Sequence, residues 1–481
     1  MNHSRLVDEK TWRHIATGNG LKLWLLVLLT GLLLLPAIVN GGPIWFPDSV
    51  EYLSVGERFW QTVVHGTHFD FYGQRSILYS AVLFLVHWNA SSWPVIVLHA
   101  VLVSTNSILV LRALHPEITK RTSWGTVLTT ILTTGVSVYV CFLMPDVLAG
   151  VMVLAMVTLL RAGRSLSSPV YAWVAISLWY GIVSHGANVL LSFGAVGCYC
   201  GIAYWYREKL EMASIVSVVC VQCIAAVSLV IIHADLYGKF SLQNPRQPVF
   251  AMARILADEP GNTYFRQNHK NLPWHVCRYS KDMPKDAGAI LWGQPGIWNR
   301  SETERQQLKS EESSVVRTIV FSDPLRQMRS SVWNVWRLVL SPVDYRILRS
   351  QTVVTRLIVA LPFMQSEYLN SRQANQRLSL ATLRAFHEVG YWLTVLGTLI
   401  LFLMNRFRFQ IAFFSSVILL NAAIAGTLSG PMPRYHERLT WVLTLVAIAA
   451  FMQWWKTWKT WRDQRVMQVQ REDSPVLGVS A

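Results

Sequence analysis

Two acidic side chains follow the first long apolar stretch of the chain, and they lie among aromatic residues. In the segment Trp-Phe-Pro-Asp-Ser-Val-Glu-Tyr over residues 45–52, Asp48 and Glu51 stand just beyond the point where a membrane-crossing helix would end. Charged groups at a membrane surface are costly to desolvate, and they often have a function. Further along, Arg75 and Tyr79 add a cation and another aromatic ring. These residue types could bind or activate a polar group beside a membrane.

Three later segments place similar residues at the ends of apolar stretches. Asp146 follows a proline between two such stretches, and His185 lies in a Ser-His-Gly turn between two others. The sequence Pro-Arg-Tyr-His-Glu-Arg at 433–438 precedes the last apolar stretch. It supplies Arg434, Tyr435 and Arg438. If all these ends lie on one side of the membrane, acids, a histidine and arginines meet there.

The residue types suggest a particular chemistry. A carboxylate such as Asp48 can act as general base toward a hydroxyl or amine, or can hold a divalent cation (Mg²⁺ or Mn²⁺) with Asp146. Arginines suit a phosphate or diphosphate, and aromatic rings can stack on sugars or line a groove for a prenyl tail. A membrane-embedded donor with a phosphate head group would use all three. No His, Asp and Glu cluster has a clear metal-ligand spacing, so metal dependence stays open.

Each of these residues also has an ordinary structural interpretation. Asp48 can cap a helix that begins at Ser49, and Asp146 can cap the apolar helix that follows it. His185 can simply form its turn. The arginines can extend to phospholipid head groups. The sequence leaves both interpretations open, but the shared side favours a site.

The composition indicates a membrane protein. Of the 481 residues, 52% are hydrophobic and only 15% are charged, whereas soluble domains carry about 25% charged residues. Much of the net charge of +16 lies in short segments beside apolar stretches, where it orients helices, so we expect no nucleic-acid partner. The six cysteines predict neither a disulfide framework nor a zinc site.

Ten apolar segments are long enough, or nearly so, to cross a bilayer, which takes about twenty residues. We therefore predict an all-α polytopic membrane protein with about ten transmembrane helices, in a range of ten to twelve. The shorter apolar segment 77–88 predicts a re-entrant or interfacial helix. The ten segments are 21–40, 93–111, 123–143, 147–160, 170–184, 187–205, 213–233, 387–404, 409–427 and 439–455.

The placement of lysine and arginine predicts the orientation. With the N-terminus in the cytoplasm, eighteen Lys and Arg residues fall in cytoplasmic segments and four in short outer loops, which follows the positive-inside rule. Both termini are then cytoplasmic, and the N-terminal segment is an uncleaved signal anchor. Asp146 and His185 did not enter that count, and they fall on the same outer face as Asp48.

This topology predicts four parts. An N-terminal transmembrane module with a long first outer loop precedes a mostly helical extracytoplasmic domain, in which 302–320 and 324–340 have helix-like patterns. The stretch 331–363, rich in Trp and Arg, is expected on the membrane surface. C-terminal transmembrane helices and a cytoplasmic tail follow. The parts are 1–233, with the first outer loop at 41–92, then 234–386, 387–455 and 456–481.

At these residues the chain resembles the GT-C superfamily of polytopic glycosyltransferases, which includes protein O-mannosyltransferases and lipid A aminoarabinose transferases. Three features match in order and side: the acidic first outer loop at 47–52, the Arg-x-x-x-Tyr of Arg75 and Tyr79, and the Pro-Asp that ends at Asp146. The Pro-Arg-Tyr at 433–435 resembles a late Arg-Tyr motif of some such enzymes. The likeness covers roughly residues 20–205, with a shorter one at 430–455.

The resemblance implies inverting transfer of a sugar from a polyprenyl-phosphate carrier to a glycan, lipid or protein acceptor on the outer face. Asp48 would be the base or a metal-associated acid, with Asp146 and Glu51 as supporting acids. The family usually has a tandem acidic pair, whereas these acids are three residues apart, and the outer domain here lies between spans seven and eight instead of at the C-terminus. The candidate residues for binding the donor phosphate and substrate are Arg75, Tyr79, His185, Arg434, Tyr435 and Arg438.

Two other classes of function fit part of the pattern. A transporter or flippase of lipid-linked saccharide is expected to carry charged residues at mid-membrane and an internal repeat, and neither is evident. A non-catalytic subunit of an envelope assembly machine would use 234–386 to bind a partner. The resemblance places the protein in the bacterial inner membrane, and an endoplasmic reticulum membrane would give the same topology.

Overall fold

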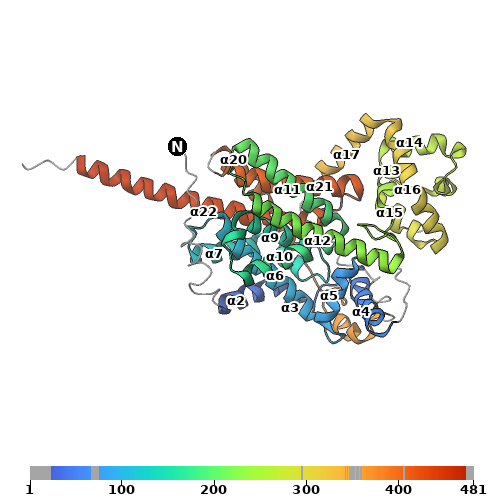
Figure 1. Ribbon diagram of the computed structural model, residues 1–481, viewed down its shortest axis with the longest axis horizontal. Coiled ribbons are helices and arrows are strands. Elements are labelled where there is room, and N and C mark those ends of the chain that lie inside the picture. Colours follow the sequence, from blue (N-terminus) through green and yellow to red (C-terminus); the bar gives the residue numbers. More distant parts are fainter. Residues whose placement is uncertain are drawn as a thin grey trace, which may run out of the picture.

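The structure, a computed structural model, describes residues 23–66, 75–293, 296–341, 343, 345, 353, 357, 360–404 and 407–472. In this part of the chain every regular element is a helix, and a single β-bridge joins Ile44 to Phe142. The predicted all-α class is therefore confirmed. Figure 1 shows a bundle of long helices with a group of shorter helices at one end. The last helix projects from the opposite end of the bundle.

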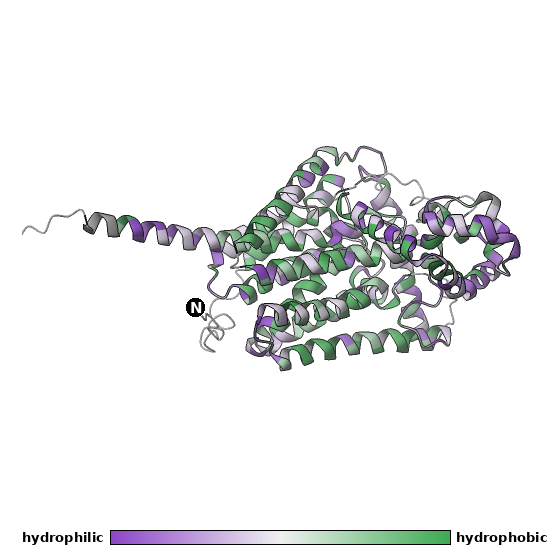
Figure 2. Cartoon of the chain, turned by 90° about the horizontal axis from the view of Figure 1, so that it is seen from above, coloured by the Kyte–Doolittle hydropathy of each residue, from purple (hydrophilic) through white to green (hydrophobic). Residues whose placement is uncertain are grey.

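Seven of the described helices are long and apolar enough to cross a membrane, as expected of a polytopic membrane protein. Each of them coincides with one of the ten predicted segments. Figure 2 shows that apolar residues dominate the bundle, while the group of shorter helices and the projecting end are more hydrophilic. The seven are α6 (Trp93–Leu114), α9 (Leu148–Ala162, continued by η1, Gly163–Ser165), α11 (Gly186–Tyr206), α12 (Met212–Tyr237), α20 (Ala381–Leu403), α21 (Arg408–Leu428) and α22 (Pro433–Glu472).

The other three predicted segments contain shorter helices. Pro36 lies in the first turn of α3, where its missing N–H cannot continue the preceding helix, so α2 and α3 are separate. A similar break at Thr134 and Gly135 separates α7 from α8. For these three segments, a full membrane crossing stays a prediction. The helices are α2 (Leu23–Leu33), α3 (Leu35–Asn40), α7 (Lys120–Thr133), α8 (Val136–Val140) and α10 (Ser168–Val183).

Helix α9 forms the centre of the bundle, because almost all of its side chains are buried. Helices α6, α10, α12 and α22 pack against it. Gly150 allows α22 to approach closely, since a Cβ there would lie 2.4 Å from the indole ring of Trp441. The start of α22 is thereby held next to the loop that leads into α9.

Helices α12 and α20 expose much of their apolar surface. Soluble monomers rarely expose contiguous apolar patches of more than a few hundred Å², whereas lipid tails favour such surfaces. This exposure supports the assignment of both helices to the membrane. Exposed apolar residues on α12 are Met212, Val216, Ile224, Val227 and Ile231, and on α20 they are Val389, Leu393, Leu396, Leu399 and Leu403.

The predicted extracytoplasmic domain is a separate group of helices with its own apolar core, which includes Leu256, Phe265 and Leu308. The two helix-like stretches predicted there are confirmed as α16 and α17. The side chain of Ser301 begins α16 in a capping box with Glu304. Much of the stretch from 342 to 359 lies outside the described residues. The helices of this group are α13 (Phe250–Ala257), α14 (Glu259–Asn268), α15 (Ala287–Trp292), α16 (Glu302–Ser322) and α17 (Pro324–Val339), with η2 (His269–Asn271), η3 (His275–Asp282) and η4 (Ile297–Asn299). The last part of the predicted domain, η6 (Pro362–Met364) and α19 (Gln365–Leu369), packs instead in the core of the bundle.

The first predicted outer loop consists of two packed helices, α4 (Ser49–His65) and α5 (Ile77–His87). Gln373, which lies far along the chain, fixes the backbone at the start of this loop. Gln373 accepts a hydrogen bond from the backbone N–H of Trp45 (2.9 Å) and donates one to the Trp45 carbonyl (2.6 Å). The backbone N–H of Gln373 also donates to Asn40 (2.8 Å). These bonds hold the backbone just before Asp48 in place.

Candidate functional site

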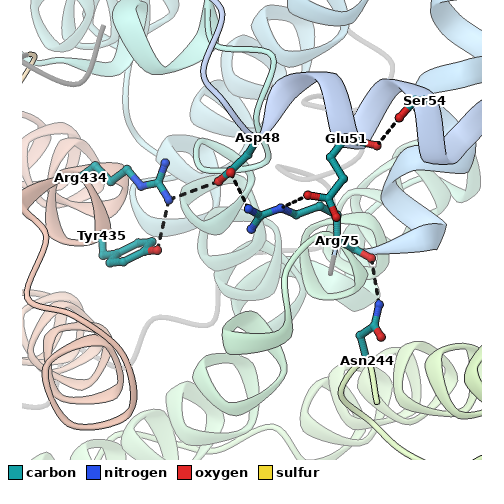
Figure 3. A network of polar contacts seen from close by, with 7 residues as sticks. All are labelled: Asp48, Glu51, Ser54, Arg75, Asn244, Arg434 and Tyr435. Atoms are coloured by element: carbon teal, nitrogen blue, oxygen red, sulfur yellow. Dashed lines mark hydrogen bonds and ion pairs between the residues drawn. The ribbon is translucent and has the colours of Figure 1, made fainter. Parts of the chain in front are cut away.

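Asp48 lies between two arginines that come from opposite parts of the chain (Figure 3). Its Oδ1 is 2.5 Å from Nη2 of Arg75, which precedes α5, and its Oδ2 is 3.8 Å from Nη2 of Arg434 in the first turn of α22. Arg75 also pairs through Nε with Glu51 at 3.3 Å. The Asp48 side chain is only 15% exposed and that of Arg434 only 9%. Thus the predicted acids and arginines meet in a mostly buried cluster.

The geometry excludes two of the ordinary interpretations. Asp48 occupies the position before α4, but its side chain makes no capping hydrogen bond. Asp146 makes none to α9 either, because the residue in the capping position is Val147. The arginines do not extend to lipid head groups, since Arg75, Arg434 and Arg438 are all largely buried within the protein. Neither the Asp48 carboxylate nor the Asp146 carboxylate therefore serves as a helix cap.

Arg434 is held by aromatic rings but lacks a full set of hydrogen-bond acceptors. Its guanidinium lies 4.3 Å from the ring centroid of Phe46 and 4.9 Å from that of Tyr435. Nη2 donates to the Tyr435 hydroxyl (3.1 Å). Among the described residues, Nε and Nη1 are buried and find no partner. An unsatisfied buried donor costs about 1–3 kcal/mol, and more when it is charged, so this guanidinium is suited to bind an oxyanion.

Arg438 and Asp146 complete the charged cluster. One turn after Arg434, Arg438 donates through Nη2 and Nε to the side-chain oxygen of Asn421 at 2.7 and 3.3 Å. Asp146 is 5% exposed, and its carboxylate forms no ion pair or hydrogen bond with the described residues. Its negative charge acts on both Arg434 and Arg438. The cluster thus balances three arginines against three acids.

Burial and neighbouring charges determine the protonation states of Arg75 and Tyr52, which lie close to the acids of the cluster. Burial opposes the charged form of Arg75, but Asp48 and Glu51 outweigh this effect and raise the pKa of Arg75 above its usual value. Burial is also the main reason that the pKa of Tyr52 is raised above 10. Arg75 is therefore a permanent cation, and the Tyr52 hydroxyl keeps its proton at neutral pH.

His185 has the structural role that the sequence left open, and its side chain also lies beside the charged cluster. It precedes α11, where its Nδ1 accepts a hydrogen bond from the backbone N–H of Ala187 at 3.2 Å. Burial, followed by the charges of Arg438, Arg75 and Arg434, lowers the pKa of His185 well below 6.5. The imidazole is therefore neutral at pH 7, as its acceptor role in the cap requires.

His185 gives a testable pH dependence of stability. In the unfolded chain it takes up a proton near pH 6.5, whereas the folded protein keeps it neutral. The unfolded state then binds more protons, so stability is lost as the pH falls below about 6.5. We expect a contribution of about 1–2 kcal/mol at pH 5. Asparagine can still cap the helix, so His185→Asn should show a smaller drop in melting temperature between pH 7.5 and pH 5.

The matched control for this measurement is His65→Asn, since His65 is exposed at the end of α4. It should leave the pH dependence of the melting temperature as in the wild type. An equal pH dependence in wild type and His185→Asn would contradict the assignment of a neutral, buried His185.

A cavity of about 270 Å³ adjoins the cluster: Arg75, Tyr435 and Arg438 line it, whereas Asp48 and Arg434 are not among its lining residues. Its lining combines polar residues of the predicted site with apolar residues of the two membrane-length helices α11 and α21. The predicted extracytoplasmic domain also contributes to it, with Lys309 and Glu312 among other residues. The polar lining includes Tyr52, Arg75, His185, Tyr435 and Arg438, and the apolar lining includes Leu190, Ile424, Ala425 and Leu428.

Tyr79 is the one predicted site residue that lies apart from the cluster. It is fully buried, and its hydroxyl is 3.3 Å from Nε2 of His99. Its ring stacks on Tyr180 and meets Tyr52 edge to face, with ring centroids 5.7 and 5.1 Å apart. Tyr79 therefore packs against Tyr52, and its side chain does not line the cavity.

Sequence reasoning missed a buried acid in the same turn of α22. Glu437 accepts hydrogen bonds from the hydroxyls of Tyr139 and Tyr345, both at 3.0 Å. A Cβ at Gly135 would lie 2.1 Å from the Glu437 carboxylate, so a larger residue at Gly135 would displace it. Helical spacing alone places Glu437 beside Arg434, and nothing in the sequence points to its two tyrosine partners.

The cluster suits an anion better than a divalent cation. Each carboxylate oxygen of Asp48 faces a guanidinium group, and within the described residues no three His, Cys, Asp or Glu side chains group as metal ligands. A cation placed beside Asp48 would be repelled by Arg75 and Arg434 at close range. The charges around Asp48 therefore do not favour the Mg²⁺ or Mn²⁺ that the sequence left open.

The site thus unites eight of the nine predicted residues from five separate regions of the chain. The acids come from the start of α4 and from the loop before α9, and the arginines come from the loop before α5 and from α22. His185 comes from the turn before α11. Compared with protein-family models, curated proteins and solved structures, the chain shows no match. Its function is therefore argued from the geometry of this cluster and its cavity.

Proposed function

We propose that the protein is a membrane glycosyltransferase of the GT-C type, which moves a sugar from a polyprenyl-phosphate donor to an acceptor on the outer face. The acceptor class is a glycan, lipid or protein. One observation carries the proposal: a buried carboxylate, Asp48, lies between Arg75 and Arg434, and Arg434 has two buried N–H groups without a partner. A base beside an oxyanion-binding cation is what this transfer needs.

The cavity matches the two halves of such a donor. Its polar wall would take the phosphate, and Leu190, Ile424 and Leu428 would contact the first isoprene units. Leu190 is 46% exposed and Leu428 is 44% exposed, so this wall reaches the outer surface of the bundle. A prenyl chain could leave the cavity over the exposed side chains of Leu190 and Leu428 and continue into lipid.

The two carboxylate oxygens of Asp48 suggest how the reaction proceeds. Oδ1 is held by Arg75, whereas Oδ2 is only loosely approached by Arg434, so Oδ2 can accept the proton of an acceptor hydroxyl or amine. The acceptor atom bonds to the anomeric carbon as the bond from that carbon to the phosphate oxygen breaks. The polyprenyl phosphate leaves with the electron pair, and Arg434 stabilises its growing charge.

The position of the charges favours this proposal over a transporter. Arg434 and Arg438 lie in the first turns of α22, and Asp146 and His185 precede α9 and α11. The charges are therefore gathered at the ends of membrane-length helices. Transporters are expected to place charged residues near mid-membrane.

The test is transfer by the purified protein in nanodiscs, with a panel of radiolabelled polyprenyl-phosphate sugars and a mixture of acceptors. Transfer or donor hydrolysis that depends on Asp48 would support the proposal and identify the sugar. Donor binding without turnover, unchanged on replacement of Asp48, would instead favour a flippase. Absence of donor binding across the panel would leave the assembly-subunit alternative as the better account.

A further inference from the structure

Helix α17 of the extracytoplasmic domain has an exposed apolar face. Large apolar side chains recur along it every three or four residues, and this spacing places them on one side of a helix. Each of these residues is between 45% and 72% exposed, whereas soluble proteins rarely expose contiguous apolar patches of more than a few hundred Å². The residues of this α17 face are Leu325, Met328, Val332, Trp333, Trp336 and Leu340, the last of which directly follows the helix.

The opposite side of α17 is buried, and it joins two parts of the protein. Gln327 and Asn334 donate hydrogen bonds to the carboxylate of Asp258, at 2.7 and 2.9 Å, so this side is bonded to the extracytoplasmic domain. Further along the same side, Leu338 belongs to one apolar cluster with Ala422 of α21. Figure 1 shows α17 between the bundle and the group of shorter helices. These contacts fix the rotation of the helix and direct the α17 face away from them.

Contacts with the ends of two membrane-length helices give the level at which α17 lies. A Cβ at Gly426, two residues before the end of α21, would lie 3.1 Å from the backbone nitrogen of Val335, so the two helices cross closely there. Tyr435, in the first turn of α22, belongs to the same apolar cluster as Val335. Helix α17 therefore crosses the bundle at the end that carries the charged cluster, which is the level of the predicted outer membrane surface.

The α17 face also adjoins apolar surface that is assigned to the membrane. The hydroxyl of Tyr391 in α20 donates a hydrogen bond to the carbonyl of Val339, the last residue of α17, at 2.9 Å. Val389 and Trp392, close to Tyr391 in α20, are exposed apolar residues. The end of the α17 face thus lies beside the exposed surface of α20, so the same layer of lipid can cover both.

The charges of α17 suit the phosphates of lipid head groups. Three arginines and no acid occur within the helix, and all three arginines are exposed. Arg326 pairs with Glu259 and Asp323, at 3.3 and 3.8 Å, whereas Arg329 and Arg337 form no ion pair with the described residues. Long arginine side chains can extend from an apolar face to head groups. An apolar face with tryptophans and arginines is typical of a helix that lies in the membrane interface.

We infer that α17 lies in the outer membrane interface, with the α17 face among lipid acyl chains and with Arg329 and Arg337 on head-group phosphates. The sequence predicted a membrane-surface location for 331–363, and this inference assigns that location to α17 from Leu325 onward. The bilayer would then hold the extracytoplasmic domain against α21, next to the cavity that Leu428 lines. The inference does not rest on the proposed function, because it requires phospholipid and no sugar donor.

The test measures photochemical labelling of lipid by the full chain in liposomes of phosphatidylcholine and phosphatidylglycerol. The photoreactive residue p-benzoylphenylalanine, which reacts with C–H bonds that it touches, replaces Trp333 in one protein. In a second protein it replaces Leu396 of the exposed α20 surface, and in a third it replaces Gln267, an exposed residue of α14. Mass spectrometry then measures the yield of phospholipid adducts. We expect the yield at position 333 to be similar to that at 396 and about tenfold higher than that at 267.

A matched pair of charge variants tests the two arginines. Arg329→Glu with Arg337→Glu should lower the lipid yield from position 333 several-fold, because the new carboxylates repel head-group phosphates. The control, Lys270→Glu with Lys285→Glu, makes the same change of charge at two exposed residues of the extracytoplasmic domain outside α17. It should leave the yield unchanged. Both variants should keep the melting temperature of the wild type, since the four side chains are exposed.

Three kinds of result would overturn the inference. Absence of a phospholipid adduct at position 333, or equal yields at 333 and 267, would contradict a location in the membrane interface. Cross-linking of position 333 to a second copy of the chain in place of lipid would assign the α17 face to a contact between copies. A loss in the arginine variant no greater than that in its control would refute the assignment of Arg329 and Arg337 to head-group phosphates.

Discussion

Asp48→Asn is expected to lower sugar transfer by about 10²–10⁴-fold, which is the usual contribution of a general base. The amide cannot accept the acceptor proton, yet it has nearly the same size and can still receive a hydrogen bond from Arg75. The protein should therefore stay folded and still bind the donor. The measurement is the initial rate of transfer with saturating donor, together with the melting temperature and the donor dissociation constant.

The control for this substitution is Glu57→Gln, since Glu57 is a nearby acid on α4 that forms no ion pair with Arg75 or Arg434. It should transfer at close to the wild-type rate. Turnover of Asp48→Asn within a few-fold of the wild type would refute the assigned role of Asp48. A large loss of donor binding would assign Asp48 to the positioning of Arg75 and Arg434 instead of to proton transfer.

Arg434→Gln is expected to lower kcat/KM for the donor by about 10²–10³-fold, the size of effect seen when a preorganised donor to a developing negative charge is removed. Both a higher KM and a lower kcat should contribute, because the phosphate is charged before transfer and gains charge as it leaves. Arg434→Lys restores the charge but not the planar fork of N–H groups, so it should recover only part of the loss.

The same substitution makes a prediction for stability that separates function from folding. Arg434 is buried with two unsatisfied N–H groups, and Asp48 keeps its closer partner Arg75 when Arg434 is lost. These two effects oppose the loss of one cation from a cluster that balances three arginines against three acids, so the free energy of unfolding should fall only modestly in Arg434→Gln. Arg58→Gln, at an exposed arginine of α4, is the control for the loss of one positive charge. Lower activity that simply follows lower stability would contradict a role in donor binding.

Much of the helical fold could be predicted from the sequence because membrane helices are defined by length and apolar composition. The segments around Leu102, Val218 and Leu396 are continuous apolar stretches, and each forms a membrane-length helix. Where Pro36 and Gly135 interrupt the pattern, hydropathy alone does not show that the helix breaks. A hydropathy count therefore predicts one continuous membrane helix at places where the structure has two shorter helices.

The composition of the site was also predictable, but its internal geometry was not. Acids and arginines at the ends of apolar stretches must gather at the two faces of a bundle, so the meeting of Asp48 with Arg434 follows from topology. The bonds of Gln373 to Trp45 join residues 328 positions apart, and Gln373 resembles any other polar loop residue. Nothing in the sequence distinguishes the tyrosines around Glu437 from other tyrosines either. The burial of Tyr79 depends on the packing of α5 against neighbouring helices, which the sequence does not show.

The length of α22 connects this cluster to the opposite end of the molecule. The helix has 40 residues without a break, so it is about 60 Å long, or twice the thickness of a bilayer core. A rigid rod of that length that tilts by about 10° around its middle moves each end by about 5 Å. Arg434 lies in the first turn of the helix, and the exposed Trp461 and its basic neighbours lie in its last third. A partner that binds or releases the far end of α22 would change the distance between Arg434 and Asp48. By linkage, donor binding that shortens this distance would shift the position of the far end of the helix.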